Sequence, residues 1–369
     1  MWNFIYLYVF CLAVLLSLLF TPLAKKLAVK LQVLDYPGER KLQEKAMPLL
    51  GGLAIFFAFL FTILVNFLIM FIIKSSPGLL NLLPSGLGST LMRNFPRFLR
   101  VLPQLIAILL GGTVILLLGL TDDIKGLRPQ TKILVQVLVI LPLIVMGVRI
   151  KLFIPNLFVS SLITLLWMVA IINAFNLLDN MDGLATGVGL IACFICFIVT
   201  SQQQQTFTSI ALLAFAGALL GFLPYNFNPA KIFLGDAGSM FIGYMLAVLT
   251  IVASYYKVSF PTHLPAVMPI LILAVPIFDT LSVISIRMKK KEPIFSPDKN
   301  HFSHRLVSLG FSQRGAVLLI YLITLCLGIT ATLLTQVNIS GAIIIFIQAA
   351  LVLSIVALLE NVAKRQRSN

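Results

Sequence analysis

Long apolar stretches separated by short polar segments dominate the chain. Most approach the roughly 20 residues that an α-helix needs to cross the hydrocarbon core of a bilayer, and the short alternating segments of a membrane β-barrel are absent. The pattern therefore predicts about eleven transmembrane helices. The predicted spans are Asn3–Pro22, Gly52–Ile73, Pro103–Leu120, Ile133–Val148, Leu157–Ile172, Leu184–Thr200, Phe207–Leu223, Ser239–Tyr255, Leu264–Ile286, Ala316–Leu334 and Ile339–Leu359.

Composition agrees with this pattern. Hydrophobic residues make up 60% of the chain and charged residues 11%, compared with roughly 25% charged residues in soluble proteins. The first apolar segment has neither a basic flank nor a small-residue cleavage site, so we expect a retained span. No polar segment is long enough to fold alone. We therefore predict an all-α, polytopic membrane helical bundle with a single domain, residues 1–369.

Basic residues indicate the orientation of this bundle. The predicted spans place 20 of the 27 Lys and Arg residues on one side of the membrane, and loops rich in Lys and Arg usually stay in the cytoplasm. This predicts an external N-terminus and a cytoplasmic C-terminus. The net charge of +15 is then mainly this orientation signal, so we expect the lipid bilayer as a partner and no nucleic acid.

Acidic residues are few and lie on one side. Of the 12 Asp and Glu residues, 11 fall on the predicted cytoplasmic side, and Asp279 lies in a span near that side. Carboxylates at a membrane edge are costly unless they are paired, hydrated or bound to a metal. We therefore expect the acidic residues to mark the functional site. Asp279 is either part of that site or a partnered structural acid.

The segment Asn173–Gly183 is the strongest candidate. Asn176, Asp179 and Asp182 are three residues apart, so on a helix they span an arc of about 120° and can face one cleft. Such oxygen-rich sets suit Mg²⁺ or Mn²⁺ better than zinc. The alternative interpretation is helix-end capping and hydrogen bonding between helices.

Two further acidic motifs stand next to predicted spans. Asp122 and Asp123 are adjacent, and a nearby cation would relieve the repulsion between their carboxylates. Asp236 lies between two glycines just before a span, where a tight turn and a helix N-terminus favour a phosphate or a metal-bound phosphate. N-capping is the alternative role for Asp236. Upstream, Asn226 offers an amide suited to sugar or base hydrogen bonds.

A cationic motif lies in the last long polar loop. His301, His304 and Arg305 bring together donors that suit a pyrophosphate. Two His residues at this spacing are also compatible with zinc, but no nearby Cys or acid completes such a site. The Cys193–Cys196 pair likewise has no His or acid beside it, so we interpret both thiols as packing groups.

Taken together, these motifs resemble the polyprenyl-phosphate N-acetylhexosamine-1-phosphate transferase family, glycosyltransferase family 4. The matching stretches follow in family order from Gly119 to Leu306 and read GLTDDIKG, NAFNLLDNMDGLATG, YNFNPAKIFLGDAGSMFIGY, PIFDTLSV and PDKNHFSHRL. Each stretch alone is a weak signal, but the set is specific.

The resemblance implies a Mg²⁺-dependent enzyme, with Mn²⁺ as the alternative ion. It would transfer a sugar 1-phosphate from a UDP-sugar to undecaprenyl phosphate and release UMP, the first membrane step of cell-envelope polysaccharide synthesis. The protein would lie in the cytoplasmic (inner) membrane as a multi-pass protein with its site facing the cytoplasm. The resemblance also suggests a homodimer.

The resemblance assigns roles to the candidate residues. It implies a metal site at Asp236 and Asn176, and catalytic roles for Asp122, Asp123, Asp179 and Asp182. Asp122 and Asp123 would position or deprotonate the lipid phosphate, with a covalent nucleophile as the alternative mechanism. The implied substrate-binding residues are Asn176, Asn226, Lys132, His301, His304 and Arg305.

Two departures indicate the branch of the family. The muramoyl-pentapeptide branch carries consecutive His residues where this chain has His301-Phe-Ser-His304, and that branch usually reads DGLDG where this chain has DNMDG. Both departures, and an extra C-terminal span, favour UDP-N-acetylglucosamine (UDP-GlcNAc), or a related UDP-N-acetylhexosamine, as donor. A phospho-N-acetylmuramoyl-pentapeptide transferase is the alternative within the family, and a transporter or flippase for lipid-linked or anionic substrates is the alternative of another class.

Overall fold

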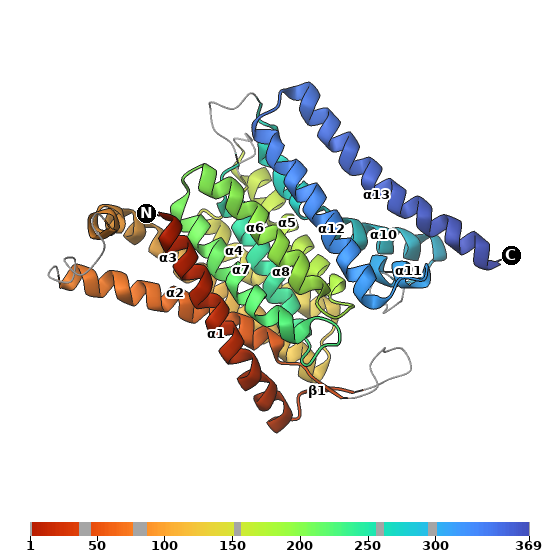
Figure 1. Cartoon of the computed structure of the whole chain (residues 1–369), viewed down its shortest axis with the longest axis horizontal. Coiled ribbons are helices and arrows are strands. Elements are labelled where there is room, and N and C mark those ends of the chain that lie inside the picture. Colours follow the sequence, from red (N-terminus) through yellow and green to blue (C-terminus); the bar gives the residue numbers. More distant parts are fainter. Residues whose placement is uncertain are drawn as a thin grey trace.

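The computed structural model describes residues 2–36, 46–76, 87–150, 156–255, 262–293 and 301–368. These residues form a bundle of helices with one two-stranded hairpin (Figure 1). The elements are α1 (Trp2–Lys30), β1 (Leu34–Asp35), β2 (Met47–Pro48), α2 (Gly51–Ser75), α3 (Leu87–Lys125), α4 (Pro129–Val145), α5 (Leu157–Leu178), α6 (Leu184–Gln202), α7 (Thr206–Asn226), α8 (Gly235–Val252), the 3₁₀ helix η2 (Leu264–Val267), α9 (Met268–Ile272), α10 (Ala274–Lys290), α11 (Phe302–Ser308), α12 (Gln313–Thr332), the 3₁₀ helix η3 (Leu333–Thr335) and α13 (Ile339–Ser368).

Membrane-spanning helices follow the predicted ranges closely. Within the described residues, eight helices are long and apolar enough to cross a bilayer: α1, α2, α3, α5, α6, α7, α8 and α12. Two shorter apolar helices, α4 and the Ile339–Ile355 part of α13, overlap two further predicted spans. The all-α polytopic class is confirmed, whereas the number of crossings and the orientation stay predictions.

One predicted span is broken. The range Leu264–Ile286 was expected to be a continuous helix, but the chain bends by 67° between η2–α9 and α10. A second difference concerns the basic segment that precedes the predicted span Pro103–Leu120. From Leu87 onwards this segment is instead continuous with α3, which contains Pro96 and Pro103.

Helix α8 lies at the centre of the bundle, where α2, α3, α5 and α6 pack around it (Figure 1). Of its residues 83% are buried, compared with 22% in the most apolar part of α1. Small residues permit this burial, because transmembrane helices pack closely where side chains are short. A Cβ atom on Gly52 of α2 would overlap the backbone of Gly238, and a Cβ atom on Gly119 of α3 would overlap the backbone of Ala237.

The first helix packs mainly against α7. Gly217 and Gly221 of α7 lie so close to α1 that a Cβ atom on either would touch the α1 backbone at Phe10 or Val14. The Ser17 hydroxyl donates a hydrogen bond of 2.7 Å to the carbonyl oxygen of Ala218. Small residues and one buried hydroxyl therefore join two helices that are far apart in the sequence. The last helix, α13, runs along one side of the bundle beside α12 (Figure 1).

The hairpin links the start of α2 to the start of α8. Strand β1 pairs antiparallel with β2, and the carbonyl oxygen of Pro48 accepts a hydrogen bond from the Phe233 amide at 2.8 Å. The Gly51 and Gly52 amides, at the N-terminus of α2, donate to the carbonyls of Phe233 and Leu234, each at 3.0 Å. Two backbone amides that have no acceptor within α2 are thereby hydrogen-bonded. The same two bonds fix the loop before α8.

We expect Gly52→Ala to destabilise the protein, because the added methyl group would overlap backbone atoms of α8 that cannot move independently. Overpacking of this kind costs about 1–3 kcal/mol of the free energy of unfolding. Gly189→Ala is the matched control, since the nearest neighbour of its new methyl group would be the Ile242 Cγ2 atom at 3.0 Å, on a side chain that can adjust. Thermal unfolding in detergent measures both variants. An equal loss in the two would contradict the close-packing role of Gly52.

Candidate active site

A pocket of about 760 Å³ lies at the end of the bundle where α3, α5 and α7 end and α8 begins. Carboxylates from four polar segments line it, and amides and one imidazole complete its polar surface. Its ionisable and amide residues are Asp35, Asp122, Asp123, Asp179, Asn180, Asp182, Asn226, Asn228, Asp236, His304 and Gln313. Acidic residues that are up to about 200 positions apart in the sequence therefore share one site.

Asp123 holds the N-terminus of α8. Its Oδ1 atom accepts a hydrogen bond of 2.7 Å from the Asp236 amide, and its Oδ2 atom accepts one of 3.1 Å from the Ala237 amide. The carboxylate thus satisfies two of the free donors of the helix and interacts with the positive end of its dipole. Gly235 precedes them at φ +72°, where a Cβ atom would also meet the Asp123 carboxylate. Asp123 therefore fixes the position of the Asp236 backbone, from which the side chain projects.

Lys132 on α4 bridges two carboxylates. Its Nζ atom lies 2.6 Å from Asp122 Oδ2 and 3.5 Å from Asp236 Oδ2. Asp122 also accepts a hydrogen bond of 2.6 Å from the Leu127 amide. The side chain of Asp122 is only 5% exposed, whereas that of Asp236 is 37% exposed. Of these two carboxylates, Asp236 is therefore the more accessible to a ligand in the pocket.

Asn176, from α5, completes this cluster. Its Nδ2 atom donates to Asp236 Oδ1 at 2.9 Å and to the Ser239 hydroxyl at 3.0 Å. The predicted metal-site pair, Asp236 and Asn176, is therefore in direct contact. In the described part of the chain, no three Asp, Glu, His or Cys side chains form a group that could enclose a metal ion. Mg²⁺ does not need such a cage, because it usually keeps several waters and binds one or two carboxylates together with substrate phosphates. The oxygen donors around Asp236 fit that requirement.

Asp179 follows the last residue of α5. Burial raises its pKa well above the ordinary range, and the negative charges of Asp236, Asp123 and Asp182 raise it further. Both causes disfavour the ionised carboxyl. The pocket therefore contains more carboxylate charge than its own cations balance, and a bound cation would relieve this repulsion.

Asp182 and Asn226 hold loops in place. Asp182 Oδ2 accepts hydrogen bonds from Asn228 Nδ2 and from the Ala230 amide, each at 3.0 Å. Asn226 is buried; its Oδ1 accepts from the Thr186 hydroxyl at 2.8 Å and its Nδ2 donates to the Ile232 carbonyl at 3.2 Å. Both side chains reach the pocket wall, and their predicted catalytic and substrate-binding roles stay predictions.

The cationic motif divides into one residue at the pocket and two behind it. His304 lines the pocket, whereas His301 and Arg305 are buried and are not part of its lining. His301 Nδ1 lies 3.0 Å from Asp279 Oδ2, and Arg305 donates to the Ser282 hydroxyl at 2.9 Å. The roles predicted for His301 and Arg305 in holding a substrate therefore stay predictions.

The environment of Asp279 was left open by the sequence, and the structure gives it two partners. Besides His301, the Asp279 carboxylate accepts a hydrogen bond of 2.6 Å from the Phe302 amide at the start of α11. Asp279 thus holds this short helix. In addition, the Ser303 hydroxyl donates to Asn180 Oδ1 on the loop after α5. These contacts attach α11, which carries His304, to the acidic end of the bundle.

Several site residues were missed by the sequence analysis. Asn228 donates to Gln313 Oε1 at 2.7 Å, and the Arg314 side chain donates to the Asn228 carbonyl at 2.8 Å, so the start of α12 closes one side of the pocket. Asn228 stood in a motif that was recognised, and its position two residues after Asn226 was a usable signal. Gln313 and Ser239 carried no such signal.

We expect Asp179→Asn to change how stability depends on pH. The pKa of Asp179 is raised in the folded protein, so the folded state favours the neutral carboxyl. Wild-type stability is therefore fully present below the ordinary value of about 4 and decreases as pH rises through the raised pKa. Asparagine cannot ionise. The stability of the variant relative to wild type should thus increase between about pH 5 and pH 8 in EDTA, measured by thermal unfolding. A difference that is constant over this range would contradict the prediction.

Comparison with known proteins identifies the family of the chain. Residues 105–254 match the description Glycosyl transferase family 4. The chain is 35% identical over 357 residues to a "Probable undecaprenyl-phosphate N-acetylglucosaminyl 1-phosphate transferase" of Bacillus subtilis (strain 168), covering 94% of this chain and 90% of the relative. It is 34% identical to a "Decaprenyl-phosphate N-acetylglucosaminephosphotransferase" of Mycobacterium leprae (strain TN), covering 84% and 79%. It is 26% identical to the "Undecaprenyl-phosphate alpha-N-acetylglucosaminyl 1-phosphate transferase" of Escherichia coli (strain K12), covering 84% and 78%. The chain therefore belongs to glycosyl transferase family 4.

Proposed function

We propose that this protein transfers N-acetylglucosamine 1-phosphate from UDP-GlcNAc to a polyprenyl phosphate such as undecaprenyl phosphate and releases UMP. The observation that carries the proposal is the pocket in which the Asp122–Asp123, Asp179–Asp182 and Asp236 motifs meet at one end of a membrane bundle. Relatives that cover most of the chain are named for the same transfer to undecaprenyl or decaprenyl phosphate. The reaction would be the first membrane step of cell-envelope polysaccharide synthesis.

The reaction joins two anions. An oxygen of the polyprenyl phosphate attacks the β-phosphorus of UDP-GlcNAc, and the bond from that phosphorus to the bridging oxygen breaks, so that UMP leaves. The acceptor is already a nucleophile. The protein therefore has to align the two phosphates, reduce their repulsion and stabilise the charge on the leaving group.

We assign Asp236, with Asn176 beside it, to hold Mg²⁺. Mg²⁺ bound there would neutralise phosphate charge and polarise the phosphoryl oxygens. Asp236 suits this role because it is the more exposed member of the Lys132-bridged pair and because Asp123 fixes its backbone. Lys132 adds a positive charge next to the same carboxylate. His304 lies on the pocket wall, where an imidazole can donate to a phosphate or to the sugar.

Under this proposal Asp122 and Asp123 have different roles. Both oxygens of Asp123 accept hydrogen bonds from α8, so Asp123 is best placed to position Asp236. Asp122 is bonded to Lys132 and to the Leu127 amide, which favours positioning the lipid phosphate through Lys132 over a covalent attack by Asp122. The direct, one-step transfer is therefore the mechanism that we propose.

The proposed setting is the cytoplasmic membrane with the pocket facing the cytoplasm. A nucleotide sugar is soluble and reaches the pocket from water, whereas the lipid acceptor approaches within the bilayer. The predicted loops on the pocket's side carry 20 of the 27 basic residues, which supports a cytoplasmic location. Assembly as a homodimer stays a prediction.

The purified protein is expected to release UMP from UDP-GlcNAc in the presence of undecaprenyl phosphate and Mg²⁺. Radiolabelled GlcNAc should appear in the lipid phase in equal amount. Omitting the polyprenyl phosphate is the control for simple hydrolysis. Turnover only with a muramoyl-pentapeptide donor would overturn the choice of donor, and no turnover with any UDP-sugar would overturn the proposed reaction.

We expect Asp236→Asn to reduce turnover at least about a hundredfold, because the side chain would lose the charge assigned to the metal. The variant should unfold at a temperature close to that of the wild type. Glu292→Gln is the matched control, an exposed acid on the same predicted side but outside the pocket, and it should keep full activity. Near-wild-type, Mg²⁺-dependent turnover of the Asp236 variant would refute the metal role.

A further inference from the structure

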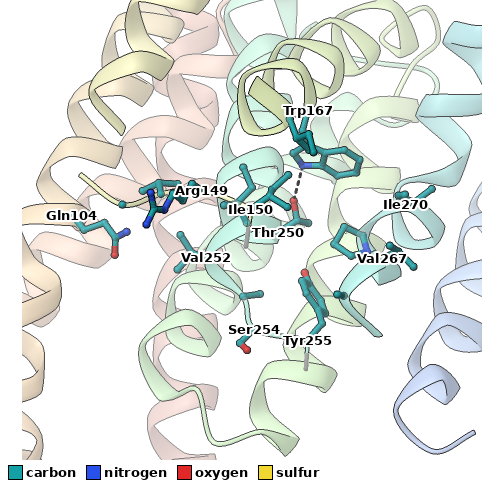
Figure 2. Close-up of a pocket in the computed structure, with 17 residues that line it drawn as sticks. Gln104, Arg149, Ile150, Trp167, Thr250, Val252, Ser254, Tyr255, Val267 and Ile270 are labelled. Atoms are coloured by element: carbon teal, nitrogen blue, oxygen red, sulfur yellow. Dashed lines mark hydrogen bonds between the residues drawn. The ribbon is translucent and has the colours of Figure 1, made fainter. Parts of the chain in front are cut away.

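A second pocket, of about 520 Å³, lies away from the acidic one (Figure 2). Thr250 and Val252 line it near the end of α8, 14 or more residues after Asp236. At a rise of about 1.5 Å per residue the two sites are therefore separated by roughly 20 Å along this helix. No described residue of the motifs that form the first site lines the second pocket. Its volume falls within the range of about 300–1,000 Å³ that is typical of ligand pockets.

Arg149 is the charged residue among the described residues that line this pocket. The neighbouring Ile150 is held against α5, because its amide donates to the Thr164 hydroxyl at 2.9 Å and its carbonyl accepts from the Ser160 hydroxyl at 2.6 Å. Ser160 and Thr164 lie three and seven residues after the first residue of α5. Arg149 thus lies beside the first two turns of α5, close to the end of a candidate membrane span.

The described residues leave Arg149 without a counter-ion. Its side chain has no hydrogen-bond or ion-pair partner among them, and the described lining of the pocket contains no acid. Figure 2 shows Arg149 and Gln104 at one side of the pocket, facing each other across its edge. An arginine near the end of a span reaches the level of the lipid headgroups, where an anionic lipid offers it an opposite charge. Arginine binds phosphate oxygens well because its planar group offers two parallel donors.

The rest of the pocket is largely apolar. Ile163 of α5, Val252 of α8 and Ile270 of α9 lie around it, and Val267 and Ile270 form the side away from Arg149 (Figure 2). The Trp167 ring closes one end, and its Nε1 atom already donates to the Thr250 hydroxyl at 3.3 Å. This wall offers hydrocarbon contacts rather than further donors to a small anion. The occupant should therefore carry a phosphate at one end and an apolar chain at the other.

We propose that this pocket binds one anionic phospholipid, with the lipid phosphate on Arg149 and an acyl chain along Ile163, Val252 and Ile270. A phosphatidylglycerol-type lipid fits better than a zwitterionic one, because no described carboxylate lines the pocket to meet an ammonium group. The bound lipid would lie between α5 and α8, which carry Asn176 and Asp236 at their other ends.

Native mass spectrometry of the full-length, delipidated protein tests the proposal. The protein is titrated with phosphatidylglycerol or phosphatidylcholine of the same chain length, and bound lipids are counted. Wild type should retain one phosphatidylglycerol more tightly than phosphatidylcholine. Arg149→Gln should weaken this binding about tenfold, through the loss of one charge-assisted contact, and Arg149→Lys should restore part of it. Arg100→Gln, which removes an exposed charge on α3 outside the pocket, should have no effect.

A second variant tests the apolar wall. Val252→Phe keeps Arg149 and fills part of the cavity, so it should also weaken phosphatidylglycerol binding. If Arg149→Gln fails to fold, this variant tests whether the lipid occupies the pocket. Equal affinity for the two lipids, or unchanged binding in both variants, would overturn the proposal. Displacement by inorganic phosphate alone would show a simple anion site, and stronger binding of undecaprenyl phosphate would show a different occupant. Either result would also overturn it.

Discussion

The hydrogen bonds from the start of α8 to the Asp123 carboxylate are the interaction on which the site depends. A helix N-terminus buried inside a membrane protein has free amides that water cannot reach. Asp123 supplies acceptors for two of them from a different helix. The same contact places Asp236 on the first turn of α8, opposite Asn176 and Lys132. The Asp123 carboxylate therefore both satisfies the N-terminus of α8 and positions Asp236 in the site.

Close approach of backbones makes this interaction possible. Gly52 and Gly119 let α2 and α3 reach the first turn of α8, which brings Asp123 within hydrogen-bonding distance. The hairpin then fixes the preceding loop through Phe233 and Leu234. The spacing of the Gly51–Gly52 pair in the sequence does not match a phosphate-binding loop. In the structure its role is steric, and it supports the site without touching a ligand.

Much of the fold was predictable, because apolar length alone sets where a helix can cross a bilayer. The site was predictable in outline, because acids are scarce in such a chain and their common side follows from the order of the spans. Individual contacts were not predictable. The residues around the bend before α10 are as apolar as those of a continuous span. The partners of Asp279 come from the start of α11, more than 20 residues away. Nor does spacing show that His301 faces Asp279 while His304 faces the pocket.

The contact between α1 and α7 has a consequence for the biogenesis of the protein. Ser17 and its acceptor Ala218 are 201 residues apart, so α1 enters the bilayer long before α7 has been synthesised. At a translation rate of about 5–20 residues per second, this interval lasts roughly 10–40 s. During that time the polar and small residues of α1 that later face α7 are exposed to lipid or to the insertion machinery. Helix α1 therefore meets its main partner, α7, late in synthesis, and slow translation prolongs its exposure.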